Sequence, residues 1–322
     1  MTPDTTSELG PPTETPGPFA HVLTVARVIG GIVLFGLVVF AAVRSWEDVR
    51  MTLARMGPVE LAVAEVLVLA GLGASVLTWR AALCELGSTM TIRAASKIYL
   101  VGQLGKFLPG SAWALALQME LAKQANVPRA RSVAAGVVAI GVNAVTGLAM
   151  GLTIVPRVVS GGAWRTITLV AVVTVCAVGL SPPLLTRLVN VGFRIVRRDP
   201  IQREVTWRGI LTAVGWAVVS FTCYGLSVWV LAISVGAPAA ESLPLCLAGV
   251  AFAMTLGALV VVAPSGIGVR EAVIVAALAP VMERPEALAI ALVARLLFVL
   301  ADLIAAVVTL PVRLREPGLG SS

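Results

Sequence analysis

Long apolar runs, separated by short polar connections, limit the folds that are open to this chain. A helix needs about 20 consecutive apolar residues to cross the hydrocarbon core of a bilayer. Such runs lie at 22–43, 59–77, 132–155, 167–185, 210–235, 243–262 and 287–310. Two further apolar stretches, at 98–121 and 267–278, start at Gly/Pro clusters and are short or interrupted. The pattern predicts an all-α polytopic bundle of about seven or eight transmembrane helices with two broken or re-entrant segments.

The composition excludes the common soluble classes of protein. Hydrophobic residues make up 58% of the chain and charged residues 13%, whereas a soluble domain carries roughly 25% charged residues. The net charge of +7 does not indicate nucleic-acid binding, because the arginines lie between the apolar runs, where membrane proteins carry them. The single histidine, His21, precedes the first run, and the four cysteines are scattered singly. We therefore expect no metal, no cofactor and no catalytic residue.

Tail composition sets the domain boundaries that we expect. Residues 1–21 are rich in Thr, Pro and Gly, a composition that cannot bury enough apolar surface to fold. The sequence predicts a disordered tail over 1–21, a single transmembrane domain over 22–315 and a flexible tail over 316–322.

Basic residues predict how the helices are oriented. The segment 186–208 is rich in arginine and 236–242 has no basic residue, so we expect the first inside the cell and the second outside. An N-terminus inside the cell places Arg44, Arg50 and Arg55 outside, against the rule. The same choice makes the two broken segments enter from opposite sides of the membrane, which is the mark of an inverted repeat.

The two broken segments carry the motifs of greatest interest. The first reads VGQLGKFLPGSAW over 101–113 and is followed by Gln118 and Glu120; the second reads APSGIGVRE over 263–271. Proline and glycine release backbone groups from helical pairing, and in a bilayer those groups need partners in protein or water. A helix that restarts after Gly266 or Gly268 aims its free amides at an anion, and Arg270 adds a full charge. The alternative is that these residues only kink and pack helices, with Arg270 and Glu271 as an interfacial pair.

Two ionisable residues lie inside the last apolar run. Arg295 and Asp302 are seven residues apart on one face of a helix, a separation of about 10 Å, so each needs its own partner. Glu271 is the partner that we expect for Arg295. The alternative for Asp302 is a solvated position near the inner interface.

Other polar and small residues in the runs predict helix packing. We expect interhelical hydrogen bonds from Gln118, Asn143 and Ser220, and close helix contact at Gly147 and Gly151. Four tryptophans fall at or near predicted span ends, where amphipathic rings settle at the headgroups: Trp46, Trp79, Trp164 and Trp207.

The motifs GKFLPGxxW over 105–113 and PSGIGVRE over 264–271 resemble those of the membrane region of the lysylphosphatidylglycerol synthase family, its flippase-like half. The resemblance covers nearly the whole chain from about residue 22. It implies movement of a phospholipid or related anionic amphiphile between leaflets. The soluble aminoacyltransferase domain of the full-length synthases has no counterpart here, so we do not expect lipid aminoacylation. With the charges of the last run and residues beside the motifs, the substrate site that we expect comprises Lys106, Pro109, Gly110, Trp113, Glu120, Pro264, Ser265, Gly266, Gly268, Arg270, Glu271, Arg295 and Asp302.

Several functions stay open at this point. The leading one is a non-enzymatic, multi-pass flippase of the cell membrane, with an anionic phospholipid or polyprenyl-linked lipid as its partner. A membrane-embedded transferase using Glu271 or Asp302 as base lacks a paired-carboxylate motif and a metal-ligand cluster. A partner subunit of a cell-envelope lipid or glycan biosynthesis enzyme, a homo-oligomer and a secondary transporter are also compatible with the sequence.

Overall fold

The computed structural model describes residues 46–107, 113–154, 162–195, 206–259 and 268–314. Within these residues the chain is helical and contains no strand. The predicted tails 1–21 and 316–322 and the predicted span 22–43 lie outside the described residues. The helices are α2 (Trp46–Arg55), α3 (Pro58–Glu85), α4 (Ile92–Gln103), the 3-10 turn η1 (Leu104–Phe107), α5 (Trp113–Gln124), α6 (Arg129–Leu152), α8 (Gly162–Gly179), α9 (Pro182–Ile195), α10 (Trp207–Ser234), α11 (Ala239–Leu259), α12 (Val269–Leu278) and α13 (Arg284–Thr309).

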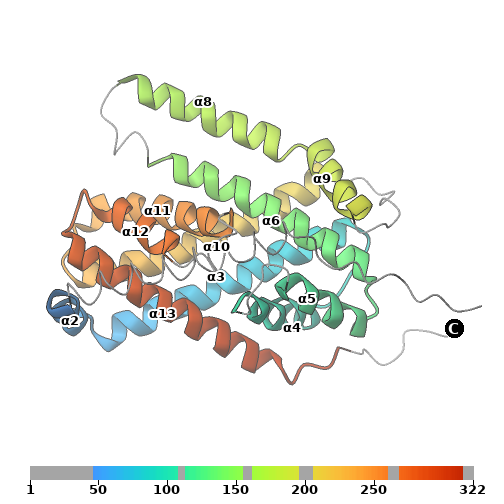
Figure 1. The fold of residues 1–322 in the computed structure, drawn as a ribbon, viewed down its shortest axis with the longest axis horizontal. Coiled ribbons are helices and arrows are strands. Elements are labelled where there is room, and N and C mark those ends of the chain that lie inside the picture. The colour runs from blue at the N-terminus through green and yellow to red at the C-terminus, as the bar shows by residue number, and fades with distance from the viewer. Residues whose placement is uncertain (1–45, 108–112, 155–161, 196–205, 260–267, 315–322) are drawn as a thin grey trace, which may run out of the picture.

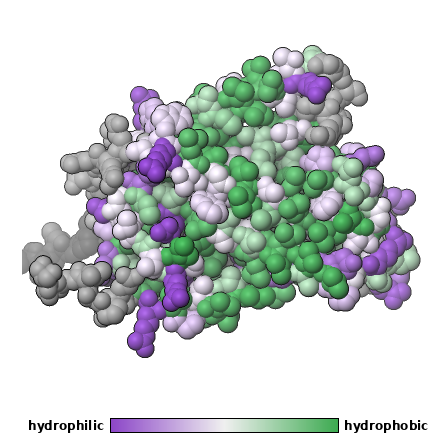
Figure 2. All heavy atoms as spheres, turned by 180° about the vertical axis from the view of Figure 1, so that it is seen from behind, coloured by the Kyte–Doolittle hydropathy of each residue, from purple (hydrophilic) through white to green (hydrophobic). Residues whose placement is uncertain are grey.

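Five of these helices, α3, α6, α10, α11 and α13, are long and apolar enough to cross a membrane. They coincide with predicted runs, and the all-α polytopic membrane fold is confirmed. Figure 2 shows the matching surface, with hydrophobic residues across the middle of the face and hydrophilic residues toward both ends. The chain is therefore a multi-pass membrane protein.

The predicted span 167–185 is wrong in its boundaries. Helix α8 ends at Gly179 and α9 begins at Pro182, so the run breaks where proline prevents the helix from continuing. Ser181 lies at the break and donates a hydrogen bond from its hydroxyl to the carbonyl of Val178, at 2.8 Å. The two helices form an arm that lies against α6, at one side of the bundle (Figure 1).

The core lies where α3 packs along α10, with α6, α11 and α13 around them. Ser220 on α10 donates to the carbonyl of Gly71 on α3 and contacts the hydroxyl of Ser75, at 2.9 and 2.8 Å. This confirms the interhelical bond predicted for Ser220. Gly147 and Gly151 pack against Thr255 and Phe252 of α11, so the predicted close contact is also confirmed. Asn143 differs, because its amide donates to the carbonyl of Ala139 in its own helix, at 2.8 Å.

Polar contacts define the two ends of the bundle. At one end Arg55 pairs with Glu286, and Trp229 donates to the carbonyl of Ala239. At the other end Glu85 accepts hydrogen bonds from Thr206, and Lys97 donates to the carbonyls of Leu310 and Val312. Arg55 therefore shares an end with the 236–242 loop, as an intracellular N-terminus requires, and its charge is balanced there by Glu286.

The two broken segments enter the bundle from opposite ends. Helices α4 and α5 lie side by side at the end that holds Lys97, while α11 and α12 lie side by side at the end that holds Ala239 (Figure 1). Each helix of the α4–α5 pair has 12 residues, about 18 Å at about 1.5 Å per residue, too short to cross a bilayer core of about 30 Å. The two pairs of helices therefore lie at opposite ends of the bundle; their insertion from opposite sides of the membrane and the inverted repeat stay predictions.

Candidate functional site

The tip of the α4–α5 hairpin places Lys106 inside the bundle. A Cβ atom at Gly105 would lie 2.6 Å from the backbone nitrogen of Ala114, so only glycine permits this close approach of the two arms. Lys106 follows on η1, and its ammonium lies 2.5 Å from the Asp302 carboxylate on α13. The short glycine-dependent turn thus carries a cation into contact with the last span.

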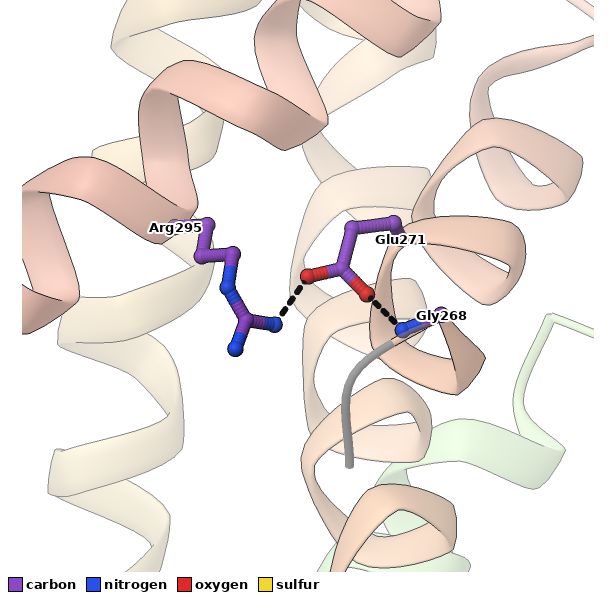
Figure 3. A network of polar contacts seen from close by, with 3 residues as sticks. All are labelled: Gly268, Glu271 and Arg295. Carbon is purple, nitrogen blue, oxygen red and sulfur yellow. Dashed lines mark hydrogen bonds and ion pairs between the residues drawn. The ribbon is translucent and has the colours of Figure 1, made fainter. Parts of the chain in front are cut away.

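The beginning of α12 places Glu271 against Arg295. Gly268, immediately before the helix, has a φ of 84°, a conformation that favours glycine. Its backbone N–H donates to Oε2 of Glu271 at 2.7 Å, and Oε1 of the same carboxylate pairs with Arg295 of α13 (Figure 3). The structure confirms the partner predicted for Arg295 and shows that Glu271 also caps its own helix.

Asp302 is buried and paired, so the interfacial alternative for it is wrong. Its side chain is 4% exposed and that of Lys106 is 28% exposed. A charge at this depth needs a partner or water, because an unpaired carboxylate in an apolar surrounding loses its hydration. We call Lys106, Glu271, Arg295 and Asp302 the charge cluster; they line one small cavity of about 50 Å³.

Arg270 lies next to the charge cluster but belongs to neither ion pair. Its side chain packs on Gly257 of α11, where an added Cβ would lie 2.6 Å from Nε of Arg270. Nε is buried and has no hydrogen-bond partner among the described residues. Arg270 lines the small cavity and also a second, larger one. It is therefore a cation between two cavities that forms no salt bridge with a described residue, although Glu271 and Asp302 lie within its electrostatic reach.

The larger cavity, which we call the polar cavity, has a volume of about 330 Å³. Its walls come from α3, α4, α5, α6, α10, α11 and α12. Its polar lining residues are Ser75, Tyr99, Gln103, Gln118, Asn143, Ser220, Tyr224, Thr255 and Arg270. Concave sites with a few polar groups among apolar walls are where small ligands and headgroups bind.

The structure brings together part of the predicted site. Lys106, Arg270, Glu271, Arg295 and Asp302 line the small cavity, and Gly268 lies beside them through its bond to Glu271. Two predicted residues lie elsewhere. Glu120 pairs with Arg129 at 2.5 Å on the surface, and Trp113 is 53% exposed and lines neither cavity. Pro109, Gly110, Pro264, Ser265 and Gly266 lie outside the described residues.

Sequence reasoning missed several residues of this region. Glu65 on α3 lies within electrostatic reach of Asp302, and its carboxylate oxygens have no hydrogen-bond partner among the described residues. An acid within the apolar run 59–77 was the signal that could have identified it. Trp79 is fully buried beside Tyr99 and lines the polar cavity, so its predicted interfacial position is wrong. The reason is that α3 continues to Glu85 and leaves Trp79 inside the bundle.

Comparison with known proteins gives the family. No curated protein matches the chain at a significant level. The family model described as lysylphosphatidylglycerol synthase TM region matches residues 27–306. The match contains both hairpins, both cavities and the charge cluster, and it connects this membrane protein with lipid metabolism. The chain belongs to the lysylphosphatidylglycerol synthase TM region family.

Proposed function

We propose that the protein is a lipid flippase of the cell membrane, which moves an anionic phospholipid or a lipid-linked anionic headgroup between leaflets. The observation that carries the proposal is the position of Arg270. It lines two cavities, and in the smaller one it lies beside Lys106 of η1. A cation whose Nε has no hydrogen-bond partner among the described residues is the feature that an anionic headgroup would complete.

The broken helices supply the rest of the binding site in this proposal. Helix α12 begins beside Arg270; Glu271 occupies the Gly268 N–H, and the positive dipole end of the helix favours an anion. The lipid phosphate binds Arg270 at this helix end, while the acyl chains stay in the surrounding bilayer. The Glu271–Arg295 and Lys106–Asp302 pairs hold α12 and the α4–α5 tip against α13, which positions the site.

The proposed activity requires binding and release but no covalent step. We therefore propose a non-enzymatic protein whose partner is the membrane lipid itself. Energy then comes from a gradient, from a partner protein or from equilibration of the lipid between leaflets.

The test is lipid movement in proteoliposomes that contain purified protein and fluorescent phosphatidylglycerol. We expect wild-type protein to equilibrate the lipid between leaflets and Arg270→Gln to slow this at least about tenfold, the effect of about 1.4 kcal/mol of lost binding free energy. The matched control is Arg50→Gln, because Arg50 is an exposed arginine that pairs with Glu47 of its own helix and lines neither cavity. We expect that variant to move lipid at the wild-type rate.

Two results would contradict the proposal. One is folded wild-type protein that moves neither anionic, zwitterionic nor polyprenyl-linked lipid, which favours a partner subunit of an envelope biosynthesis enzyme or a secondary transporter. The other is equal loss of movement in the Arg270 and Arg50 variants. Circular dichroism and size-exclusion profiles establish that each variant is folded before its rate is compared.

A further inference from the structure

We infer that the polar cavity selects a phosphate-linked polyol headgroup, such as glycerol, inositol or a sugar, and disfavours a headgroup that carries a cation. The inference rests on the proposed flippase function and names the substrate class of the same site. It follows from the charges that line the cavity, from the amide groups that face it and from its size.

The first step is the distribution of charge. Among the described residues that line the polar cavity, Arg270 is the one cation and no carboxylate is present. Of the nearby acids, Glu271 and Asp302 are each paired with a cation in the charge cluster, and Glu65 does not line the polar cavity. A cationic headgroup in the polar cavity would therefore meet Arg270 and no free carboxylate, and like charges at low dielectric repel strongly. A phosphate with a neutral substituent is instead attracted by Arg270 and brings no positive charge that Arg270 would repel.

The second step is the set of amide side chains. Gln118 on α5 is 4% exposed, lines the polar cavity and has no hydrogen bond to another described residue. Asn143 on α6 uses its amide nitrogen for the carbonyl of Ala139, which leaves its side-chain oxygen for a ligand. An amide both donates and accepts, as a hydroxyl does, and a buried amide without a partner costs free energy. The third amide of the lining, Gln103, hydrogen-bonds to Tyr99. Gln118 and Asn143, beside a phosphate-binding cation, fit a substituent rich in hydroxyl groups.

The third step is that the hydroxyl groups of the wall are already occupied. Ser75 contacts Ser220 at 2.8 Å and Tyr224 at 3.2 Å, and Ser220 also donates to the carbonyl of Gly71. This network joins α3 to α10 and fixes one wall of the cavity. Recognition of the headgroup is therefore left to the amides and Arg270, on a wall whose geometry is already set.

The fourth step is size. A volume of about 330 Å³ lies at the small end of the roughly 300–1,000 Å³ of ligand pockets. It accommodates a headgroup and excludes a pair of acyl chains. Buried hydrogen-bonding groups in such a site discriminate strongly against an analogue that leaves them unpaired.

The experiment measures binding, so that it is independent of lipid movement. Purified full-length protein in detergent is titrated with dihexanoyl phosphatidylglycerol, phosphatidylinositol, phosphatidylethanolamine and lysylphosphatidylglycerol, and the bound fraction is read by native mass spectrometry. We expect the first two lipids to bind about tenfold more tightly than the last two, as the loss of one buried hydrogen-bond partner predicts.

A variant pair locates the selectivity. We expect Gln118→Leu to weaken binding of the two polyol lipids about tenfold, because the amide that pairs with their hydroxyl groups is gone, and to leave binding of the other two lipids unchanged. Gln124→Leu, an exposed position on the same helix, is the matched control and is expected to keep the wild-type order. If the Gln118→Leu variant does not fold, the order of the four lipid affinities of the wild-type protein tests the inference.

Equal or tighter binding of phosphatidylethanolamine or lysylphosphatidylglycerol by the wild-type protein would overturn the inference. Retention of the wild-type order by folded Gln118→Leu would also overturn it. The proposed function fails separately, when the protein moves no lipid in proteoliposomes although it binds the polyol lipids in the expected order.

Discussion

The charge cluster and the polar cavity lie side by side, share Arg270 as a neighbour and are built in opposite ways. In the charge cluster each of the four ionisable groups has a partner of opposite charge, and the cavity there is about 50 Å³. In the polar cavity Nε of Arg270 and the amide of Gln118 have no hydrogen-bond partner among the described residues, and the space is about 330 Å³. The cluster therefore contributes to stability, whereas the cavity has the unpaired groups that a ligand needs.

The largest expected effect is on the charge cluster. Asp302→Ala removes the buried carboxylate that pairs with the half-buried Lys106, which should lower the free energy of unfolding by about 3 kcal/mol. The measurement is the melting temperature in detergent, with Glu47→Ala in the exposed Arg50 pair as control, where the loss stays below about 1 kcal/mol. The double variant Lys106→Met with Asp302→Leu should recover part of the loss. A double variant as unstable as Asp302→Ala would contradict the assignment of the cluster to stability, because stability would then not depend on pairing.

A smaller loss is expected at the second ion pair. Glu271→Gln keeps an oxygen that accepts the Gly268 N–H but removes the charge that pairs with Arg295. The expected cost is about 1.5–3 kcal/mol, the contribution of a hydrogen bond to a charged group. Chemical unfolding followed by circular dichroism measures it, with Glu283→Gln as the exposed control that makes no capping hydrogen bond. No difference between the two variants would show that the cluster does not stabilise the fold.

Gly257→Ala tests the wall that holds Arg270. The new Cβ would lie 2.6 Å from Nε and 2.7 Å from Cγ of Arg270, so the arginine side chain must shift. We expect a stability loss of about 1 kcal/mol together with weaker binding of phosphatidylglycerol. Gly215→Ala is the matched control, since an added Cβ there meets no atom within 4 Å. If the variant loses stability but binds phosphatidylglycerol normally, the position of Arg270 does not determine lipid binding in the polar cavity.

The smallest effect is expected outside both regions. Glu120 pairs with Arg129 on the surface, away from either cavity, so Glu120→Gln should change neither the melting temperature nor the rate of lipid movement. Parallel assays with Arg270→Gln give the reference loss. A comparable loss in Glu120→Gln would mean that the site extends along α5 beyond the polar cavity.

Hydropathy predicted most of the fold because the bilayer itself imposes it. A span must be apolar and about 20 residues long whatever its neighbours are, so α3, α6, α10, α11 and α13 were visible in the sequence. The break between Gly179 and Pro182 was missed because its flanking residues are apolar on both sides. Pro182 indicated a helix break at this point, but the length of the apolar run led to the prediction of one continuous span.

The site was predicted less completely than the fold. Glu271 and Arg295 were expected to pair because both are charged groups that cannot face lipid. The pairing of Lys106 with Asp302 depends on how deeply the α4–α5 tip enters the bundle, which hydropathy does not encode. The polar cavity depends on packing among seven helices, so the ligand role inferred for Gln118 became apparent only when those helices were placed.

The opposed hairpins also change the barrier that a headgroup meets. Carrying a charge through about 30 Å of unbroken hydrocarbon is costly. Here the short helices α4, α5 and α12 reach into the bundle from its two ends, and Lys106 and Arg270 line one cavity inside it. A headgroup that enters from either leaflet reaches the same binding site after it has crossed only part of the hydrocarbon thickness. In the proposed flippase, the single high free-energy barrier to headgroup crossing is thereby replaced by two lower barriers. The bound state at Arg270 is the free-energy minimum between them.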